Sequence, residues 1–456
     1  MREYFGTDGF RGEVNVTLTA RHAYEIGRYI GSVTAEEKKG SGKRAKIVIG
    51  KDPRRSSYMY EYALSAGLCA SGADAYLLHV TTTPSVSYVT RTEGFDLGVM
   101  ISASHNPYTD NGIKIFDGTG GKADDGLTGG IERYLDCVED GKDYLPYATG
   151  ENVGRTVDFV QGRNRYIGML VSLSRASFAG LKIGLDCANG STFYIAKSVF
   201  DALGAKTVCF SAAPDGLNIN RNCGSTHPYF LQKAVVEQGL DMGFAFDGDG
   251  DRCICVDETG AVRDGDHILY AIARELKKTD ELDGNTVIAT VTSNGGLISS
   301  LGGRGISVLR TRVGDRFVYE KMLETDASLG GEQSGHIIFR KHMATGDGIL
   351  TAVKLAETAV ENKKPFSALF EGLDIYPQAQ ENVRVKHKTE IMRSAPMQAA
   401  AFSVEETLRE SGGRLLLRPS GTEEMIRVLC EAPDETLCKE LAAKLRREIE
   451  NIDRKV

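Results

Sequence analysis

The sequence lacks any run of 18 apolar residues, about the length that a membrane-spanning helix needs. Its opening residues, MREYFGTD, contain no apolar stretch of the kind found in a secretory signal. Nine cysteines occur with no CxxC pair and no regular spacing, and an odd, unpatterned set is typical of reduced thiols rather than of a disulfide framework. We therefore expect a cytoplasmic protein with no membrane partner.

The chain also lacks an excess of positive charge, since its formal net charge is -7. General nucleic-acid binders need a basic surface to displace counterions from phosphates. We therefore expect no nucleic-acid partner, and any anionic substrate would need local cationic groups. The 456 residues are too many for one hydrophobic core and predict three or four domains. Hydrophobic residues make up 41% and charged residues 26% of the chain, which excludes disordered and fibrous classes.

Similar stretches recur along the chain and indicate an internal repeat. Each stretch opens with a short apolar strand, continues with a helical segment and reaches a second apolar run. The opening strands are predicted at residues 46–52 (KIVIGKD), 182–189 (KIGLDCAN) and 286–294 (TVIATVTSN), and the second runs at residues 75–80, 206–210 and 307–310. Continuous apolar runs separated by helices are typical of parallel strands buried on both faces. The repeat therefore predicts three similar α/β units.

A closing segment ends each unit, and in each an apolar strand runs into a polar loop that contains glycine or serine. These segments are DLGVMISASHN from Asp96, DMGFAFDGDGD from Asp241 and, less closely, DASLGGEQSGH from Asp326. Ligands of open α/β sheets bind beyond the carboxyl ends of strands. We therefore expect the loops to occupy comparable places, with a cleft between the units able to bring them together.

The sequence changes character after about residue 370. Pro377 interrupts the chain, a helix is expected around residues 395–411, and the terminal segment has leucine or isoleucine at i, i+4 spacing from Leu437 to Ile449. We expect a small α+β domain there. Residues 35–46 (AEEKKGSGKRAK) contain glycines and lysines, but not in the order of a phosphate-binding loop, and we interpret them as a solvated connection.

The segment DGDGDR places Asp247, Asp249 and Asp251 at alternate positions with glycines between them. Glycine lets the backbone bend so that all three carboxylates can face one hard cation. The spacing also resembles an EF-hand loop, but Arg252 stands where that loop needs glycine, and strands rather than helices are expected on both sides. The alternative is a solvated acidic turn. Because carboxylates crowded after a buried strand repel one another without a cation, we predict a metal site.

The segment ISASHNP offers Ser102 and Ser104 beside His105, and Pro107 enforces a non-helical turn. A serine hydroxyl is a poor nucleophile unless a base, a metal or a prior phosphorylation changes it. By itself the segment fits a capped turn at least as well. Ten residues after Ser104, Lys114 can exchange protons or bind phosphate, whereas a lone lysine is usually a solvated surface group.

Two further loops carry groups that could contact a ligand. FGTDGFRG, residues 5–12, surrounds the forked cation of Arg11 with glycines, although a glycine-rich hairpin is the plain alternative. GGEQSGH, residues 330–336, presents Glu332 and Ser334 for sugar hydroxyls and His336 for proton exchange near neutral pH. Alone, this segment also fits a polar turn.

The segment RPSGTEE begins at Arg418 and combines a guanidinium with the hydroxyls of Ser420 and Thr422 and the backbone amide of Gly421. Arg427 follows nearby. Arginine forks and backbone amides match phosphate oxygens in geometry. We therefore predict a phosphate site in the last domain, with a turn between two strands as the alternative.

The segments FGTDGFRG, ISASHNP, DGDGDR, GGEQSGH and RPSGTE, in this order along the whole chain, resemble the α-D-phosphohexomutase superfamily of phosphoglucomutases and phosphomannomutases. Within it, GVMISASHNPYTDNGIKIF, GGEQSGHIIF, RTRVGDRFV and ATGDGILTA resemble the bacterial branch that acts on glucosamine phosphate, and Gln333 stands where relatives acting on glucose or mannose phosphates usually carry another residue. The resemblance implies an intramolecular phosphotransferase, an isomerase that interconverts the 6- and 1-phosphates of glucosamine for amino-sugar and cell-wall precursor synthesis. The close alternative is a glucose or mannose phosphate specificity. A metallophosphatase and a non-catalytic phosphosugar sensor are the others.

The resemblance also implies a role for each residue that matches a motif. Ser104 would carry the phosphoryl group, with Ser102 as a bystander, and a sugar bisphosphate would be both intermediate and activator. Mg²⁺ would be held by Asp247, Asp249, Asp251 and a phosphoserine oxygen. The remaining implied roles are Arg11, His105 and Arg252 around the phosphoryl group, Lys114 and His336 for acid/base exchange, Glu332 and Ser334 for sugar hydroxyls, and Arg418, Ser420, Gly421, Thr422 and Arg427 for the non-reacting phosphate.

The implied fold is α/β, with four domains around a central cleft, the first three being similar mixed α/β sandwich units and the last a small α+β domain. The expected domains are 1–155 with the phosphoserine loop, 156–256 with the metal loop, 257–370 with the sugar loop and 371–456 with the phosphate loop. Two departures stand out: Glu424 replaces a usual proline, and residues 117–130 (DGTGGKADDGLTGG) are rich in glycine. The oligomeric state, monomer or homodimer, stays open.

Overall fold

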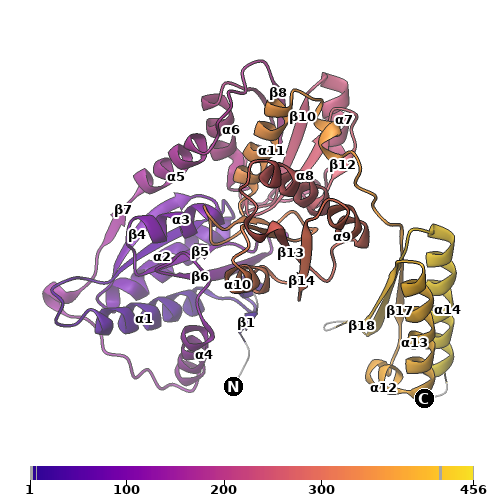
Figure 1. The fold of residues 1–456 in the computed structure, drawn as a ribbon. Coiled ribbons are helices and arrows are strands. Elements are labelled where there is room, and N and C mark those ends of the chain that lie inside the picture. Colours follow the sequence, from indigo (N-terminus) through magenta and orange to yellow (C-terminus); the bar gives the residue numbers. More distant parts are fainter. Residues whose placement is uncertain (1–3, 7, 421–423, 455–456) are drawn as a thin grey trace. The chain divides into compact units, whose positions relative to one another are not determined.

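The computed structural model of the chain, drawn in Figure 1, describes residues 4–6, 8–420 and 424–454. The chain divides into two compact units, the first made of Met1–Thr292 and Leu309–Glu371 and the second of Ser293–Val308 and Gly372–Val456. Across the described residues, every helix is too short or too polar to cross a membrane.

The first sheet of the first unit has the strand order β1-β2-β6-β5-β3-β4-β7. Its strands are β1 (Phe5–Gly6), β2 (Gly9–Glu13), β3 (Lys46–Lys51), β4 (Asp74–Val80), β5 (Leu97–Ile101), β6 (Asp110–Asp117) and β7 (Thr156–Asp158). The accompanying helices are α1 (Ala20–Glu37), α2 (Arg55–Ala70), α3 (Thr83–Thr92) and α4 (Asp125–Glu139), followed by the short η1 (Gly150–Asn152). Strand β3 pairs in parallel with β4 and β5, and its apolar residues Ile47, Val48 and Ile49 are fully buried, as the sequence predicts.

The next sheets of the first unit have the orders β12-β11-β10-β8-β9 and β14-β13-β15-β16. Their strands are β8 (Lys182–Asp186), β9 (Lys206–Phe210), β10 (Met242–Phe246), β11 (Cys253–Asp257), β12 (Val262–Arg263), β13 (Thr286–Thr290), β14 (Ser307–Thr311), β15 (Leu329–Gly331) and β16 (Ile337–Phe339). The helices are α5 (Val160–Ser172), α6 (Thr192–Ala202), α7 (Tyr229–Gln238), α8 (Gly265–Lys278), α10 (Asp315–Thr325) and α11 (Gly348–Asn362), with η2 (Asp283–Asn285) and η3 (Phe366–Phe370). Strand β8 pairs in parallel with β9 and β10, and β13 with β15.

One local strand order recurs in these sheets and confirms the repeat predicted from the sequence. It is seen as β5-β3-β4, β10-β8-β9 and β15-β13-β14. The closing strand then turns back into an antiparallel strand, β6, β11 or β16. The sheets are therefore mixed, as the resemblance implies, although the apolar runs alone predicted only their parallel part. The polar loops predicted for the three closing segments lie in these hairpins, each at the carboxyl end of the closing strand.

Carboxylate caps fix the starts of helices that border these hairpins. Asp264 accepts hydrogen bonds from the N–H groups of Asp266 and His267 at the start of α8, and Asp347 accepts one from the N–H of Leu350 at the start of α11. Such caps are worth about 1 kcal/mol each. The N–H of Gly348, the first residue of α11, donates to the carbonyl of Gly250 at 3.0 Å, so this helix is tied to the predicted metal loop.

The second unit contains the sheet β17-β19-β18, in which β19 pairs antiparallel with both neighbours. Its elements are α9 (Gly295–Gly302), β17 (Gln378–Arg384), α12 (Lys388–Arg393), α13 (Ala395–Glu410), β18 (Arg414–Pro419), β19 (Met425–Glu431) and α14 (Glu435–Asp453). The helices expected around residues 395–411 and at the terminus are observed as α13 and α14. Leu445 and Ile449 of α14 pack in one core with Val428 of β19, so the predicted small α+β domain is confirmed.

Candidate active site

The hairpin loops of the first unit meet at one site. The loop after β5 meets the loop after β10 where the Ser104 hydroxyl donates to Asp247 Oδ2 at 2.5 Å. The loop after β15 joins them, because His336 Nδ1 lies 3.7 Å from Asp251 Oδ2. A Cβ atom on Gly248 would lie 2.5 Å from the carbonyl oxygen of Ser104, so glycine at this position permits the close approach. Residues predicted from distant parts of the sequence are thereby brought together.

The carboxylates of Asp247, Asp249 and Asp251 form a buried cluster whose ligand oxygens all lie within 4.8 Å of one another. One oxygen of Asp249 and one of Asp251 are buried and accept no hydrogen bond from the described residues. Buried carboxylate oxygens without partners are costly. Burial and the two neighbouring carboxylates raise the pKa of Asp247 well above its usual value. This all-oxygen donor set fits a hard divalent cation such as Mg²⁺.

Ser104 is buried and held in a left-handed backbone conformation. Its φ of 51° lies in the left-handed region, which costs a residue with a side chain about 1 kcal/mol or more. The Ser104 N–H donates to the hydroxyl of Ser102 at 2.9 Å, and that hydroxyl donates to Asp52 Oδ2 at 2.7 Å. Ser102, expected to be a bystander, thus helps to hold the loop.

Arg54 is the main support of the Ser104 loop, and the motifs did not predict it. Its guanidinium is fully buried and paired with Asp52 at 2.7 Å. It donates to the carbonyl oxygens of Ser104, Asn106, Pro107 and Asp110. The amide of Asn220 also donates to the Ser104 carbonyl, at 2.8 Å. The available signal was the placement of Asp52 at the carboxyl end of the predicted strand over residues 46–52.

Lys114 lies on β6, fully buried among carboxylates. Its Nζ is 2.9 Å from Asp249 Oδ2, 3.1 Å from Asp8 Oδ2 and 3.5 Å from Asp251 Oδ2. Burial alone would lower the pKa of Lys114, but these carboxylates raise it well above its usual value. The site therefore holds Lys114 as a cation beside the predicted metal ligands.

His336 faces Lys114 across Asp251. The N–H of Gly346 donates to its Nε2 at 2.9 Å, so the neutral ring carries its proton on Nδ1, towards Asp251. Burial lowers the pKa of His336, whereas Asp251, Asp315 and Glu332 outweigh burial and raise it to about 9. Protonation of Nε2 would break the hydrogen bond that this atom accepts from the Gly346 N–H. The predicted acid/base pair, Lys114 and His336, is thus brought to one carboxylate.

Two arginines lie beside the segments that carry Ser104 and Asp247. The Arg11 side chain donates to Asn106 Oδ1 at 3.4 Å, and the backbone N–H of Arg252 donates to Asp247 Oδ1 at 3.2 Å. The Nε atoms of both arginines are buried without a hydrogen-bond partner among the described residues. His105 Nδ1 lies 3.3 Å from Ser104 Oγ, and burial together with the two arginines lowers the pKa of His105 to about 4. This arrangement favours an anion next to Ser104.

A cavity of about 450 Å³ lies beside the two arginines and has room for a hexose phosphate. Its lining includes Arg11, Arg252, Glu332 and His336. Glu332 Oε1 accepts from the N–H of Gly314 at 2.9 Å. The amide of Gln333 instead donates to Asp264 at 3.1 Å, and Gln333 does not line this cavity. The Gln333 amide is therefore directed to Asp264 and not into the cavity.

The predicted phosphate loop belongs to the second unit. Arg418 on β18 and Arg427 on β19 are directly opposite each other in the antiparallel ladder. Like charges in this position destabilise a sheet, and an anion between them would offset the repulsion. Lys388 Nζ also donates to the carbonyl of Ser420 at 2.9 Å. Gly421 and Thr422 lie outside the described residues, and Glu424 is exposed.

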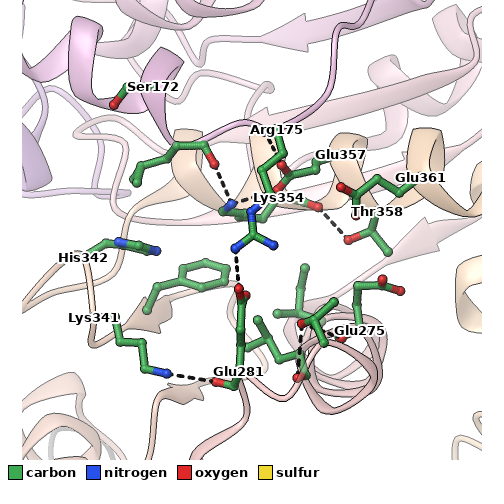
Figure 2. Close-up of a pocket in the computed structure, with 15 residues that line it drawn as sticks. Ser172, Arg175, Glu275, Glu281, Lys341, His342, Lys354, Glu357, Thr358 and Glu361 are labelled. Atoms are coloured by element: carbon green, nitrogen blue, oxygen red, sulfur yellow. Dashed lines mark hydrogen bonds and ion pairs between the residues drawn. The ribbon is translucent and has the colours of Figure 1, made fainter.

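A separate cavity of about 320 Å³ lies between α5, α8 and α11, and it shares no lining residue with the first (Figure 2). Two of its basic residues pair with neighbouring carboxylates: Arg175 with Glu281, and Lys354 with Glu357 at 2.8 Å. Lys354 also donates to the carbonyl of Leu173 at 2.7 Å. These contacts bridge the helices around the cavity, and with its charges compensated in this way we assign it no ligand.

Family models cover almost the whole chain. Those of the phosphoglucomutase/phosphomannomutase family match as alpha/beta/alpha domain I over residues 2–141, domain II over residues 164–260, domain III over residues 264–376 and the C-terminal domain over residues 381–448. The chain therefore belongs to the phosphoglucomutase/phosphomannomutase family.

Full-length relatives narrow the comparison within this family. A phosphoglucosamine mutase from Lachnospira eligens is 55% identical over 439 residues, covering 96% of both chains, and one from Lachnoclostridium phytofermentans is 54% identical over 442 residues, covering 97% of both. Among solved structures, a phosphoglucomutase/phosphomannomutase family protein from Burkholderia thailandensis has a TM-score of 0.80 at 25% identity, covering 99% of this chain and 98% of that one. The Aspergillus fumigatus N-acetylphosphoglucosamine mutase, solved in complex with GlcNAc-6P and magnesium, has a TM-score of 0.69 at 16% identity, covering 99% of this chain and 96% of that one. At this identity the comparison supports a common fold alone.

Proposed function

We propose that the protein is a phosphoglucosamine mutase, which interconverts glucosamine 6-phosphate and glucosamine 1-phosphate through a phosphorylated Ser104 and a bisphosphorylated sugar. The observation that carries the proposal is the Ser104 hydroxyl held 2.5 Å from Asp247 in the buried carboxylate cluster. The identities of 55% and 54% to proteins named phosphoglucosamine mutase support the choice of sugar.

Asp247, Asp249, Asp251 and an oxygen of the phosphorylated Ser104 would hold Mg²⁺. When bound, Mg²⁺ would supply Lewis-acid stabilisation of charge on the phosphoryl oxygens. Arg11 and Arg252 are proposed to share that charge, because their buried Nε atoms have no hydrogen-bond partner among the described residues. His105, kept neutral by its lowered pKa, can hydrogen-bond the same group without adding charge.

In the first half-reaction a sugar hydroxyl attacks the phosphorus of the phosphoserine. The new O–P bond forms while the bond from Ser104 Oγ to phosphorus breaks. The attacking hydroxyl loses a proton and Ser104 Oγ gains one, and Lys114 and His336 are the residues proposed for these transfers. A cation on the aspartate cluster would lower the pKa of both, because it takes up the carboxylate charge that favours their protonated forms.

The bisphosphate would then turn over and return its other phosphoryl group to Ser104, which completes the isomerisation. Glu332 and Ser334 are proposed to bind sugar hydroxyls: Glu332 lines the cavity, and the buried Ser334 hydroxyl lacks a hydrogen-bond partner among the described residues. The phosphate that is not reacting would be held by the second unit. The proposed residues there are Arg418, Ser420, Gly421, Thr422 and Arg427.

Other parts of the proposal concern the protein in the cell. It would act in the cytoplasm on a phosphosugar, with a sugar bisphosphate as activator and without a nucleic-acid or membrane partner. Its product would feed amino-sugar and cell-wall precursor synthesis. The domain boundaries at 155/156, 256/257 and 370/371 remain predictions. For the oligomeric state, both a monomer and a homodimer stay open.

The proposal is tested by incubating the protein with Mg²⁺, glucosamine 6-phosphate and a trace of glucosamine 1,6-bisphosphate, and following the phosphorus resonances with time. A mutase forms glucosamine 1-phosphate, and the rate depends on the bisphosphate. Release of inorganic phosphate without isomerisation would make the protein a phosphatase. Binding of the sugar without turnover would make it a sensor.

A further inference from the structure

The glycine-rich segment after β6 forms a tight turn that returns the chain to its own strand. The carboxylate of Asp117 accepts hydrogen bonds from the N–H groups of Thr119 and Gly121, at 2.8 and 3.2 Å. Gly120 has a φ of +81°, and a Cβ atom there would lie 2.5 Å from the carbonyl of Ser87. An antiparallel bridge then pairs Lys122 with Phe116 of β6. The turn thus brings Lys122 alongside the strand that carries Lys114.

Lys122 lies between carboxylates from opposite ends of the first unit's sequence. Its Nζ is 2.8 Å from Asp8 Oδ1 and 2.7 Å from Asp315 Oδ1. Asp8 precedes β2, and Asp315 begins α10. Only 17% of the Lys122 side chain is exposed. Burial by itself lowers the pKa of Lys122, but Asp315 and Asp8 outweigh burial and raise it, so the bridge is a cation between two anions.

The second oxygen of each carboxylate faces a proposed proton-transfer residue. Asp8 Oδ2 is 3.1 Å from Lys114 Nζ, and Asp315 Oδ2 is 3.7 Å from His336 Nε2. Asp251 Oδ2 joins the far ends, at 3.5 Å from Lys114 and 3.7 Å from His336. The groups form a closed ring in which basic and acidic side chains alternate: Lys114, Asp8, Lys122, Asp315, His336 and Asp251.

We propose that Lys122 is a positioning residue for phosphoryl transfer, which orients Asp8 and Asp315 and through them Lys114 and His336. This inference rests on the proposed function. Without the ammonium group, the partly buried carboxylates of Asp8 and Asp315 would repel each other. Asp8 would turn towards its remaining partners Arg11 and Lys114, and Asp315 towards His336. Because misplacing a reacting group by about 1 Å can cost about 100-fold in rate, the effect should fall on kcat rather than on binding of the sugar.

The chain offers a matched control at the neighbouring position. Arg316, the second residue of α10, pairs with Asp125 at the start of α4 and has no place in the ring. Like Lys122, it joins segments that border the same turn, but it is more exposed. A purely structural role for these ion pairs predicts similar effects of Lys122→Met and Arg316→Met. A positioning role predicts that only Lys122→Met changes kcat.

The experiment measures kcat, KM and thermal unfolding for the wild type, Lys122→Met, Lys122→Arg, Asp315→Asn, the double variant Lys122→Met/Asp315→Asn and Arg316→Met. We expect Lys122→Met to lose about 10- to 100-fold in kcat with KM changed by less than about threefold. Lys122→Arg should recover most of the rate, and Arg316→Met should match the wild type. The double variant should lose less than the product of the two single losses, because the two residues act through one contact.

A kcat for Lys122→Met within twofold of the wild type, or equal losses in Lys122→Met and Arg316→Met, would overturn the inference. If Lys122→Met does not fold, kcat of Lys122→Arg and of Asp315→Asn tests the positioning role. Complete loss of kcat in Lys122→Arg, or no loss of kcat in Asp315→Asn, contradicts that role. Failure of the proposed function gives a different result, since the wild type itself would then form no glucosamine 1-phosphate. In that case the same variants are compared by the rate at which a sugar bisphosphate phosphorylates Ser104, measured by mass spectrometry. A lower rate in Lys122→Met than in Arg316→Met supports the positioning role of Lys122, and equal rates contradict it.

Discussion

Replacing Asp249 by asparagine should remove metal binding while leaving the metal-free fold nearly as stable as before. The substitution keeps the shape of the side chain. The asparagine oxygen can still accept from Thr83 Oγ1 and Lys114 Nζ, which lie 2.5 and 2.9 Å from Asp249 Oδ2. The amide nitrogen replaces the oxygen that accepts no hydrogen bond from the described residues.

The charges lost at Asp249 nearly compensate one another. Repulsion from Asp247 and Asp251, with ligand oxygens within 4.8 Å, amounts to at least about 3.5 kcal/mol for each pair at an effective dielectric constant of about 20. Attraction to Lys114 at 2.9 Å amounts to about 6 kcal/mol on the same scale. The metal-free variant should therefore unfold within a few degrees of the wild type.

The assay is thermal unfolding with and without Mg²⁺, together with turnover. Magnesium at about 100 times its dissociation constant stabilises a protein by about 2.7 kcal/mol, so we expect the melting temperature of the wild type to rise by about 4 °C and that of Asp249→Asn not to change. Turnover should fall by about 10³-fold or more, because several kcal/mol of charge stabilisation are lost. Asp280→Asn, the same substitution at an exposed site, is the control. An undiminished magnesium shift in Asp249→Asn would refute the assignment of the metal site.

Other substitutions and a change of pH test the remaining roles. Ser104→Ala should abolish both turnover and phosphoryl incorporation from a sugar bisphosphate, and label retained in this variant would place the phosphoserine elsewhere. The folded-state pKa of His336 is raised from 6.5 to about 9. The free energy of unfolding of the metal-free protein should therefore fall by about 3 kcal/mol as the pH rises from about 6.5 to about 9. Denaturant titrations in EDTA should show a weaker dependence of this free energy on pH for His336→Gln. Arg418→Ala should raise KM about 10-fold or more, and an unchanged KM would exclude Arg418 from the phosphate site.

The sequence was sufficient to predict the repeat because buried parallel strands leave continuous apolar runs, as in KIVIGKD and KIGLDCAN. The return strands were harder to see. Strand β6 carries Asp110, Asn111 and Lys114 among its apolar residues, so no continuous apolar run identifies it. Lys114 can be buried because the carboxylates that compensate its charge come from other loops. No local sequence pattern contains that information.

The candidate site was predictable where a whole group of reactive residues lies in one short segment, as in DGDGDR. Supporting residues were not, because their partners are far away in the sequence. Arg54 acts through carbonyl groups of residues 104–110, and Lys122 through Asp8 and Asp315. The glycine-rich segment before Lys122 stands out in the sequence, but the need for glycine at position 120 depends on the position of Ser87, which only the fold reveals.

The most direct test of phosphoglucosamine mutase activity compares kcat/KM for the 6-phosphates of glucosamine, glucose and mannose under identical conditions with Mg²⁺ and the matching bisphosphate. We expect kcat/KM for glucosamine 6-phosphate to exceed the other two values by orders of magnitude. A higher kcat/KM for glucose or mannose 6-phosphate would contradict the sugar specificity while leaving the phosphoserine chemistry in place. Absence of turnover with all three sugars would contradict the mutase function itself.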